Sequence, residues 1–483
     1  MVSIRAAAPL VMLLLSGCVV GPDHTAPEIT LPSKFAEGSV KSNGDISTDQ
    51  WWTAFNDSRL NSYVKQGLDQ NLDILQAMER INQAEADVIS AGAGGLPSLA
   101  LGSGVTRSGT RVMSGSGGTI PRTTASAGLE GSWLLDFFGL YSRSKQAALA
   151  QLDAADAAVD TARLSLLSQV AAAYIDVRYY QESIALARSN LKSRNETLDL
   201  TKLQLDAGAA SRLDVVQSES QVNLTLATIP ALETQYRQAA HRVATLLGMP
   251  ASSLLGELQK GARQPVARFN AKAGVPADLI RNRPDIRAAE RQLAAAVANI
   301  GVAEAQLYPS ISLGGSITPS YTRLNGGPES KLLSWSFGPT LNLPIFDGGQ
   351  LRANLSARES LAREAYLAWK KTVLTAVEEV ENALAAVTRD SRTVSANRAT
   401  VASSQEALTL ATASYRDGAS SLLDVLDAQR NVSDAQSNLA NAIRVMAQDY
   451  VSLSVAMGGG YAYGKAPAGP KGPTVIAAKS LKK

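Results

Sequence analysis

Two aspartates, Asp424 and Asp427, stand three residues apart in the stretch "YRDGASSLLDVLDAQ" near the C-terminal end of the chain. Residues three apart lie on nearly the same face of a helix, so the two carboxylates would point the same way. An earlier copy of the phrase, "LDAGAASRLDVVQSE", carries Asp214 but has Gln217 at the second position. Carboxylates gathered at a narrow opening favour cations and oppose anions. If these segments line an opening, the second copy is a candidate for a charged gate.

Each copy of the phrase also predicts a tight helical hairpin. A glycine would end one helix in the left-handed conformation, and a serine three residues later would cap the next. The glycines are Gly208 and Gly418, and the serines are Ser211 and Ser421. Asp214 and Asp424 complete Ser-x-x-Asp capping boxes, which is a sufficient account of Asp214. Asp427 lies outside its box, and capping does not explain it.

Little else in the chain suits catalysis. There are two histidines, His24 and His241, and one cysteine, Cys18. No P-loop, no Gly-x-Ser-x-Gly and no metal-binding Cys/His spacing is present. The 46 basic and 43 acidic residues are interspersed, so the net charge of +3 provides no basic footprint for nucleic acid. We expect a protein that is not an enzyme and holds neither a metal nor a cofactor, apart from a covalent lipid.

Cys18 stands directly behind an apolar N-terminal segment. The stretch "MVSIRAAAPLVMLLLSGC" joins Arg5 to an apolar run and then to small residues, which is the pattern of an export signal. Its end, "LLSGC", resembles the bacterial lipobox, in which the cysteine thiol is lipidated and becomes the first mature residue. Residues 1–17 are therefore predicted to be a signal peptide and Cys18 the lipidation site. Val19 follows instead of aspartate, which indicates the outer membrane, facing the periplasm.

Long helical patterns precede both glycine-serine phrases. One runs from about 141 to 205 without Pro or Gly, and the other from 349 to 416. The apolar ladder of the second repeats about every 3.6 residues, unlike the 3.5 of a conventional coiled coil, which predicts nearly straight helices. Return helices are predicted at 211–247 and 421–457. Proline cannot donate the helical hydrogen bond, so Pro230 should kink or break the first of them.

Segments rich in Gly, Ser and Thr predict two β-hairpins, at 96–138 and 308–346, each after a shorter helical pattern. The order helix, hairpin, long helix, helix thus occurs twice, which indicates an internal tandem duplication. The predicted organisation is an extended tether at 18–50, a first repeat at 51–260 with its tip hairpin at 205–214, a second repeat at 261–460 with its tip hairpin at 415–427, and a disordered tail at 461–483.

The two hairpins raise the question of membrane crossing. Beyond the N-terminal segment no apolar run reaches the ~18 to 20 residues of a spanning helix, so a crossing would use β-strands. Four strands cannot close a barrel, and in lipid every backbone N–H and C=O must be paired. Other protomers would have to complete the barrel. The alternative is a soluble pair of hairpins lying on the helices. Aromatic residues near the strands are candidates for an interfacial girdle or for core packing: Trp133, Phe137, Phe138, Tyr141, Trp335, Phe337 and Phe346.

Several motifs, in order, together resemble the outer membrane efflux lipoproteins of the TolC-like family, in its OprM/NodT branch. They are the lipobox at Cys18, "WWTAF" from Trp51, "NLDILQAMERINQAEA" from Asn71, "RNRPDIRAAERQL" from Arg281 and the paired glycine-serine phrases. The resemblance covers nearly the whole mature chain, from Cys18 to about residue 460.

The resemblance implies an α+β membrane protein. It would be a homotrimer with four strands per protomer in a twelve-stranded transmembrane β-barrel, continued by a long periplasmic α-helical barrel. It would act as a passive exit duct for small molecules, drugs or other toxic compounds, with a role in multidrug resistance. An inner-membrane transporter, of the resistance-nodulation-division (RND) class, would deliver them through a periplasmic adaptor protein.

The resemblance also assigns roles to the tips. The gate would comprise Asp424 and Asp427, with a closing tether between Tyr415 and Asp214 of adjacent hairpins. Some relatives carry a basic residue in the loop where this chain has Ser420, so an ion pair there is not expected. Adaptor contact is assigned to Gly208, Ser211, Gly418 and Ser421.

Two alternative functions stay open at this stage. A lipid-anchored periplasmic scaffold that conducts nothing would explain the lipobox and the long helices but not the strands. The exit duct of a protein-secretion system is the second alternative, within the class of transport proteins. Lipidation of Cys18 favours small-molecule efflux over secretion only by analogy with the family.

Overall fold

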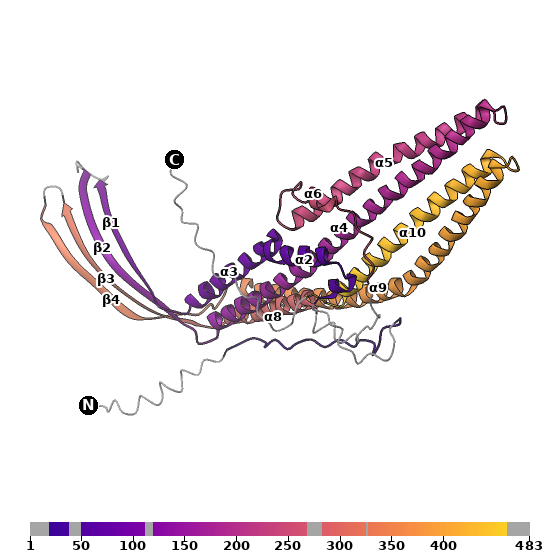
Figure 1. Cartoon of the computed structure of the whole chain (residues 1–483). Helices are drawn as coiled ribbons and strands as arrows, with labels where there is room; N and C mark the ends of the chain where they lie inside the picture. Colours follow the sequence, from indigo (N-terminus) through magenta and orange to yellow (C-terminus); the bar gives the residue numbers. More distant parts are fainter. Residues whose placement is uncertain (1–18, 38–49, 112–118, 268–282, 325–326, 461–483) are drawn as a thin grey trace. The chain divides into compact units, whose positions relative to one another are not determined.

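The computed structural model describes residues 19–37, 50–111, 119–267, 283–324 and 327–460 (Figure 1). The chain divides into two compact units. Unit 1 comprises Met1–Glu28, Arg80–Asp156 and Ala288–Lys370, and unit 2 comprises Ile29–Glu79, Ala157–Arg287 and Lys371–Lys483. The predicted signal peptide, Cys18 and the tail at 461–483 lie outside the described residues.

The order short helix, two strands, long helix and return helix occurs in both halves of the described chain, and the first half also contains a 3₁₀ helix and two further helices. The first half contains the 3₁₀ helix η2 (Trp51–Phe55), α2 (Ser58–Gln70), α3 (Leu72–Ala93), β1 (Ser98–Arg111), β2 (Thr119–Leu135), α4 (Leu140–Asp206), α5 (Arg212–Leu246) and α6 (Leu255–Leu258). The second half contains α8 (Pro284–Ala305), β3 (Ser310–Leu324), β4 (Glu329–Asn342), α9 (Gln350–Arg416) and α10 (Leu422–Ala456). Corresponding helices have equal lengths: 22 residues in α3 and α8, 67 in α4 and α9, and 35 in α5 and α10.

Of the two outcomes predicted at Pro230, a kink or a break, the break is wrong, because α5 continues through this residue. Proline leaves the carbonyl four residues earlier, that of Leu226, without its helical donor. Leu226 and Pro230 are both exposed, so water can satisfy that carbonyl. The hydroxyl of Thr234 also donates to the Pro230 carbonyl at 2.9 Å. An exposed position thus tolerates a proline that a buried one would not.

Unit 1 contains a four-stranded antiparallel sheet in the order β1-β2-β3-β4. The middle pairing joins the two halves of the chain, with Arg122 opposite Leu324 and Leu135 opposite Ile311. β1 and β4 are the outer strands, and along their outer edges no strand among the described residues is paired. The backbone N–H and C=O groups of these two edges are therefore available to another chain.

Side chains alternate between the two faces of this sheet, and residues directly opposite each other share a face. The registers place large apolar residues on one face: Leu99, Leu101, Val105, Leu129, Trp133, Ile317, Leu333, Trp335, Phe337 and Leu341. This apolar face is exposed in the single chain, with Leu101 and Trp335 each 76% exposed. The other face, here called the polar face, is mostly Ser, Thr, Gly and Ala, with larger apolar residues only near the strand ends.

The main core lies in unit 2, where α2, α4 and α5 pack together. Leu60 on α2, Leu167 on α4 and Val243 on α5 are completely buried within it. At one side Tyr450 packs edge-to-face against Trp51 and Phe55, with ring centroids 6.3 and 5.4 Å apart. The "WWTAF" motif therefore contributes buried aromatic packing rather than chemistry.

A buried side chain in each half holds the last carbonyl of the return helix. Asn71 precedes α3, and its Nδ2 donates to the Leu246 carbonyl at 2.9 Å. Arg283 precedes α8, and its guanidinium donates to the Ala456 carbonyl at 3.1 Å. Leu246 and Ala456 are the last residues of α5 and α10. Each half thus bonds the last carbonyl of its own return helix from a corresponding position. The donor is an asparagine amide in the first half and an arginine guanidinium in the second.

Asn71→Ala tests this arrangement. The change removes the bond to Leu246 and also the Oδ1 acceptor for the N–H groups of Asp73 and Ile74, at 2.9 and 3.2 Å. We expect a loss of about 2–3 kcal/mol in the free energy of unfolding, measured by urea denaturation. The control is Asn397→Ala, whose exposed amide donates to the Thr393 carbonyl, and it should change stability by less than about 0.5 kcal/mol. An equal loss of stability in both variants would contradict the proposed role of the Asn71 side chain in bonding the end of α5.

Candidate functional site

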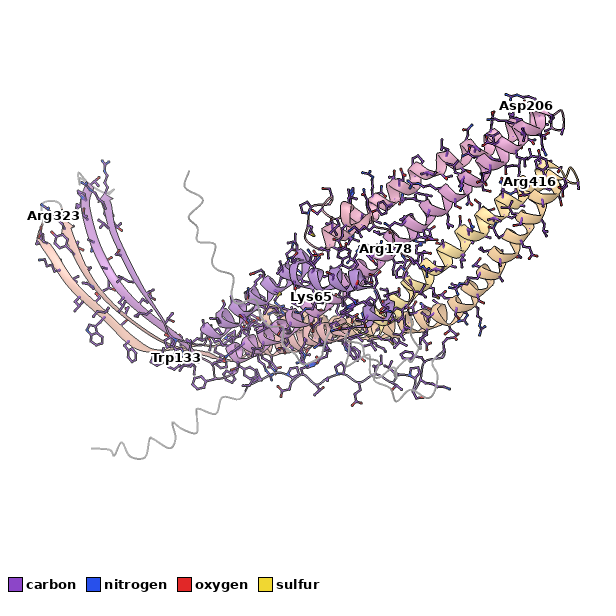
Figure 2. All side chains as sticks on the ribbon, in the orientation of Figure 1. Lys65, Trp133, Arg178, Asp206, Arg323 and Arg416 are labelled. Atoms are coloured by element: carbon purple, nitrogen blue, oxygen red, sulfur yellow. The ribbon has the colours of Figure 1, made fainter. Side chains whose placement is uncertain are left out.

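The two helical hairpins of unit 2 end in the same turn. Gly208 and Gly418 have left-handed φ values of 75° and 72°. After each glycine an alanine N–H reaches back five residues, Ala209 to the Gln204 carbonyl and Ala419 to the Ser414 carbonyl, both at 2.8 Å. These bonds form a Schellman motif, which satisfies carbonyls at a helix C-terminus. The predicted glycine stops are confirmed, and Figure 2 marks the helix ends at Asp206 and Arg416.

Both predicted capping boxes are present as well. The Ser211 backbone N–H donates to Asp214 Oδ2 at 2.8 Å, and the Asp214 N–H donates to Ser211 Oγ at 3.2 Å. In the second hairpin the Ser421 N–H donates to Asp424 Oδ2 at 3.0 Å. Asp424 therefore caps α10 while its charge stays exposed at the tip. A substitution at Asp424 will change local helix stability as well as charge.

Asp427 has a partner that the sequence reading missed. Arg430 lies one turn further along α10, and its guanidinium reaches Asp427 Oδ1 at 3.0 Å. Both side chains are nearly two-thirds exposed, so water and salt weaken the pair, and it offsets only part of the carboxylate charge. A basic residue three positions after an aspartate on a predicted helix would have indicated this pair in the sequence. The first half has Gln217 and Ser220 at the corresponding positions, so this charge pair belongs to the second hairpin alone.

Tyr415 joins the two hairpins near their tips. Its ring is buried against Leu422 and Val425, with Leu200 of α4 packed on the same cluster. Its hydroxyl has no hydrogen-bond partner among the described residues. Asp214, the expected partner, is bonded to Ser211 instead. The structure of one chain does not bring Tyr415 and Asp214 together, so the tether between adjacent hairpins stays a prediction.

A buried amide next to the tips links α10 to α4, which sequence reasoning did not identify. Gln429 Nε2 donates to Thr197 Oγ1 at 2.8 Å and to the Ser193 carbonyl at 3.3 Å. Both Gln429 and Thr197 are buried. Because a buried amide is costly to leave unpaired, this contact sets the register between the two helices close to the candidate gate.

Two carboxylates face each other between α9 and α10, further from the tips. Burial, together with the charge of Asp449, raises the pKa of Asp390 to about 6. Burial also raises the pKa of Asp449. One oxygen of Asp390 is buried without a hydrogen-bond partner in the described structure. Asp449 also lines a groove of about 450 Å³ with Glu379 and Ser452. When one of the two carboxyls keeps its proton it can donate to the other, and the two carboxylates repel each other when both are ionised.

The described part of the tether begins at Val19, the residue after the predicted lipidation site. In unit 1 the buried Arg143 donates to the Val20 and Gly21 carbonyls of this segment at 2.9 and 2.8 Å. The same guanidinium forms an ion pair with Asp23 at 2.7 Å. Gly21 has φ +89°, and a Cβ there would collide with the backbone of Gly301. The chain is therefore held in an extended path immediately after Cys18.

Among the described residues, no helix combines the length and apolar character that crossing a membrane requires. In the same part of the chain no group of three or more His, Cys, Asp or Glu side chains is placed to hold a metal ion.

An amphipathic sheet with open edges and paired long helical hairpins are together the architecture of an outer membrane channel. The chain belongs to the outer membrane efflux protein family, whose sequence model matches residues 63–249 and again 275–459. This family comprises efflux channels, not enzymes. The resemblance inferred from the motifs is thereby confirmed.

Individual relatives match over nearly the full length. The chain is 54% identical over 480 residues to nodulation protein T of Rhizobium leguminosarum bv. viciae, covering 99% of this chain and 98% of that protein. It is 32% identical over 460 residues to the pyoverdine export outer membrane protein OpmQ of Pseudomonas aeruginosa, covering 93% and 95%. Among solved structures, the outer-membrane channel OprN matches with a TM-score of 0.82 at 30% identity, covering 92% of this chain and 100% of that one.

The Asp390–Asp449 pair predicts a dependence of stability on pH. A carboxyl whose folded pKa is raised stabilises the folded state fully below its unfolded pKa, and this stabilisation is lost as pH rises through the folded pKa, here about 6. Asp390→Asn removes the repulsion, so the variant should be more stable than the parent near pH 7.5, by about 1 kcal/mol after allowance for solvent exposure, with the difference closing near pH 4.

Thermal unfolding across this pH range measures the effect of Asp390→Asn. The exposed Asp199 on α4 provides a control, since Asp199→Asn should change stability by less than about 0.5 kcal/mol at either pH. A variant at Asp390 that is less stable than the parent near pH 7.5 would rule out the repulsive pair.

Removing the charges at the second tip tests the candidate gate. Asp424→Ala combined with Asp427→Ala should raise single-channel conductance or weaken cation selectivity in a planar bilayer, because the carboxylates at the opening are gone. Ser421→Ala removes the Oγ that donates to Asp424 Oδ2 at 2.9 Å while keeping both carboxylates, and it controls for weakening of the cap. Trimer bands on a gel should persist in both variants. Unchanged conductance and selectivity in the Asp424/Asp427 variant would contradict the gate.

Proposed function

We propose that this protein is the outer membrane exit duct of a tripartite efflux system and passively exports small molecules. The observation that carries the proposal is the sheet in unit 1, which has one apolar face, one polar face and two unpaired edges. The apolar span of β4, from Leu333 to Leu341, matches the roughly nine to eleven residues of a membrane-crossing strand. An exposed apolar face of this extent suits lipid, and the polar face suits water.

The unpaired edges require further strands. In a membrane every backbone N–H and C=O must be bonded, so β1 and β4 need partners. A second and third copy of the chain supply them, and three copies give a closed barrel of twelve strands. Trp133 at one end of the sheet and Arg323 at the other bracket the apolar face, as aromatic and charged residues do at membrane boundaries (Figure 2).

The helices of the same trimer would form a periplasmic tube. Each protomer contributes two hairpins, α4 with α5 and α9 with α10, and the two halves of equal helix lengths support an internal tandem duplication. At the tips, Asp424 and Asp427 would form rings of carboxylates that close the tube to anions. The exposed loop residues Gly208, Ser211, Gly418 and Ser421 would contact the periplasmic adaptor.

The remaining parts of the system follow from the family and the N-terminus. Cys18 would carry the lipid, including palmitate, that anchors the tether to the outer membrane. An inner-membrane transporter of the RND class would supply the energy and choose the substrate. The relative named for pyoverdine export supports a small molecule as cargo. Neither relative named above supports the protein-secretion alternative in this way. A non-conducting scaffold would not explain why the sheet has one apolar and one polar face.

Two measurements test the duct together. The purified protein should migrate as a heat-sensitive trimer on a gel, and it should produce discrete single-channel currents in a planar bilayer. Boiling should convert the trimer band to monomer, because closure of the barrel depends on non-covalent pairing between protomers. A folded protein that gives neither a trimer nor a current would support the scaffold and overturn the duct. Replacing Cys18 with Ser should release the protein from lipid attachment while leaving the current intact.

A further inference from the structure

The polar face of the sheet carries very few charges. Every position on this face can be assigned from the strand registers, and only Arg122 and Glu130, both on β2, are ionisable. The other charged residues of the sheet lie on the apolar face near the hairpin ends: Arg107, Arg111, Arg323, Glu329 and Lys331. A charge on the otherwise neutral polar face therefore dominates the local electrostatic potential.

Glu130 is surrounded by the smallest side chains. Across the sheet it lies opposite Ala100 on β1 and Ser316 on β3. Along its own strand, its neighbours on the same face are Gly128 and Ser132. Glu130 is exposed, and it is the longest side chain at this level of the face. Its carboxylate therefore extends further from the sheet than any group around it.

Arg122 is too far away to neutralise Glu130. The two residues are eight positions apart on one strand, roughly 27 Å at about 3.4 Å per residue. That distance exceeds the screening length of about 8 Å at physiological ionic strength. Arg122 also lies near the hairpin end, where it donates to Thr322 Oγ1 at 3.4 Å. Glu130 therefore acts as an isolated negative charge on this face.

We propose that Glu130 is a second selectivity site of the duct, formed by three carboxylates on the water-facing side of the β-barrel. This inference rests on the proposed trimeric duct, in which the polar face lines the passage. The ring favours inorganic and organic cations over anions in the membrane-spanning section. Glu130 lies in unit 1 and in the first half of the chain, whereas the tip aspartates lie in unit 2 and in the second half.

The test is the potassium-to-chloride permeability ratio of single channels under a salt gradient. The measurement uses the full-length protein carrying Asp424→Ala and Asp427→Ala, so that the tip carboxylates do not mask the barrel. In this background Glu130→Gln should lower the ratio by about threefold, and Glu130→Lys should lower it further or invert the preference. Glu329→Gln removes the same charge from the same sheet but on the apolar face, and it should leave the ratio unchanged.

Chemical modification provides a second readout. Cys18 is the only cysteine of the chain and is lipidated in the mature protein we propose, so Glu130→Cys introduces the single free thiol. A negatively charged thiosulfonate reagent should restore the cation preference of this variant, and a positively charged one should oppose it. Channels whose ratio responds to neither Glu130→Gln nor the reagents would overturn the selectivity site while leaving the duct intact. Equal effects of Glu130→Gln and Glu329→Gln would also overturn it. Absence of any channel in the parent protein would instead refute the proposed function.

Discussion

The requirement that every backbone N–H and C=O in a membrane be paired is the constraint on which the rest of this protein depends. One chain provides four strands with an apolar face, and it leaves the outer edges of β1 and β4 unpaired. Such a sheet is unstable alone in either water or lipid, because water penalises its apolar face and lipid penalises its edges. In the proposed trimer, neighbouring copies pair these edges, so assembly would complete the fold and enclose a passage.

The two halves of the chain solve the same structural problems and differ where function is expected. Each half ends its long helix with a glycine, caps the return helix with a Ser-x-x-Asp box and satisfies a terminal carbonyl from the residue before its shorter helix. The differences are charges. Asp427 and Arg430 occur only in the second half, and Glu130 only in the first. In the proposed duct, these charged positions are the ones that would set selectivity.

Buried arginines hold irregular backbone against the helices in both units. Arg143 binds the carbonyls of the tether, and Arg178 binds the Lys260 carbonyl at 3.1 Å. Arg178 also donates to the Tyr174 hydroxyl at 2.8 Å. A guanidinium has several donors in one plane, so it can satisfy carbonyls from a loop and still keep a partner on its own helix. These contacts fix segments that have no secondary structure of their own.

Local patterns in the sequence alone determined most of the secondary structure and the turns at the tips. The spans of the four long helices, the two hairpins, the glycine stops and the capping boxes depend on residues within a few positions of one another, and the structure confirms them. The single helix expected through residues 60–81 is instead two helices, α2 and α3, separated at Asn71. Only the tertiary structure decided which side chains meet across long separations. The strand registers, the Asp390–Asp449 pair and the burial of Arg143 join segments far apart in the chain, and no local signal distinguishes these residues from surface charges. The physical reason is that propensity and capping act over one helical turn, whereas burial and charge pairing depend on which elements pack together.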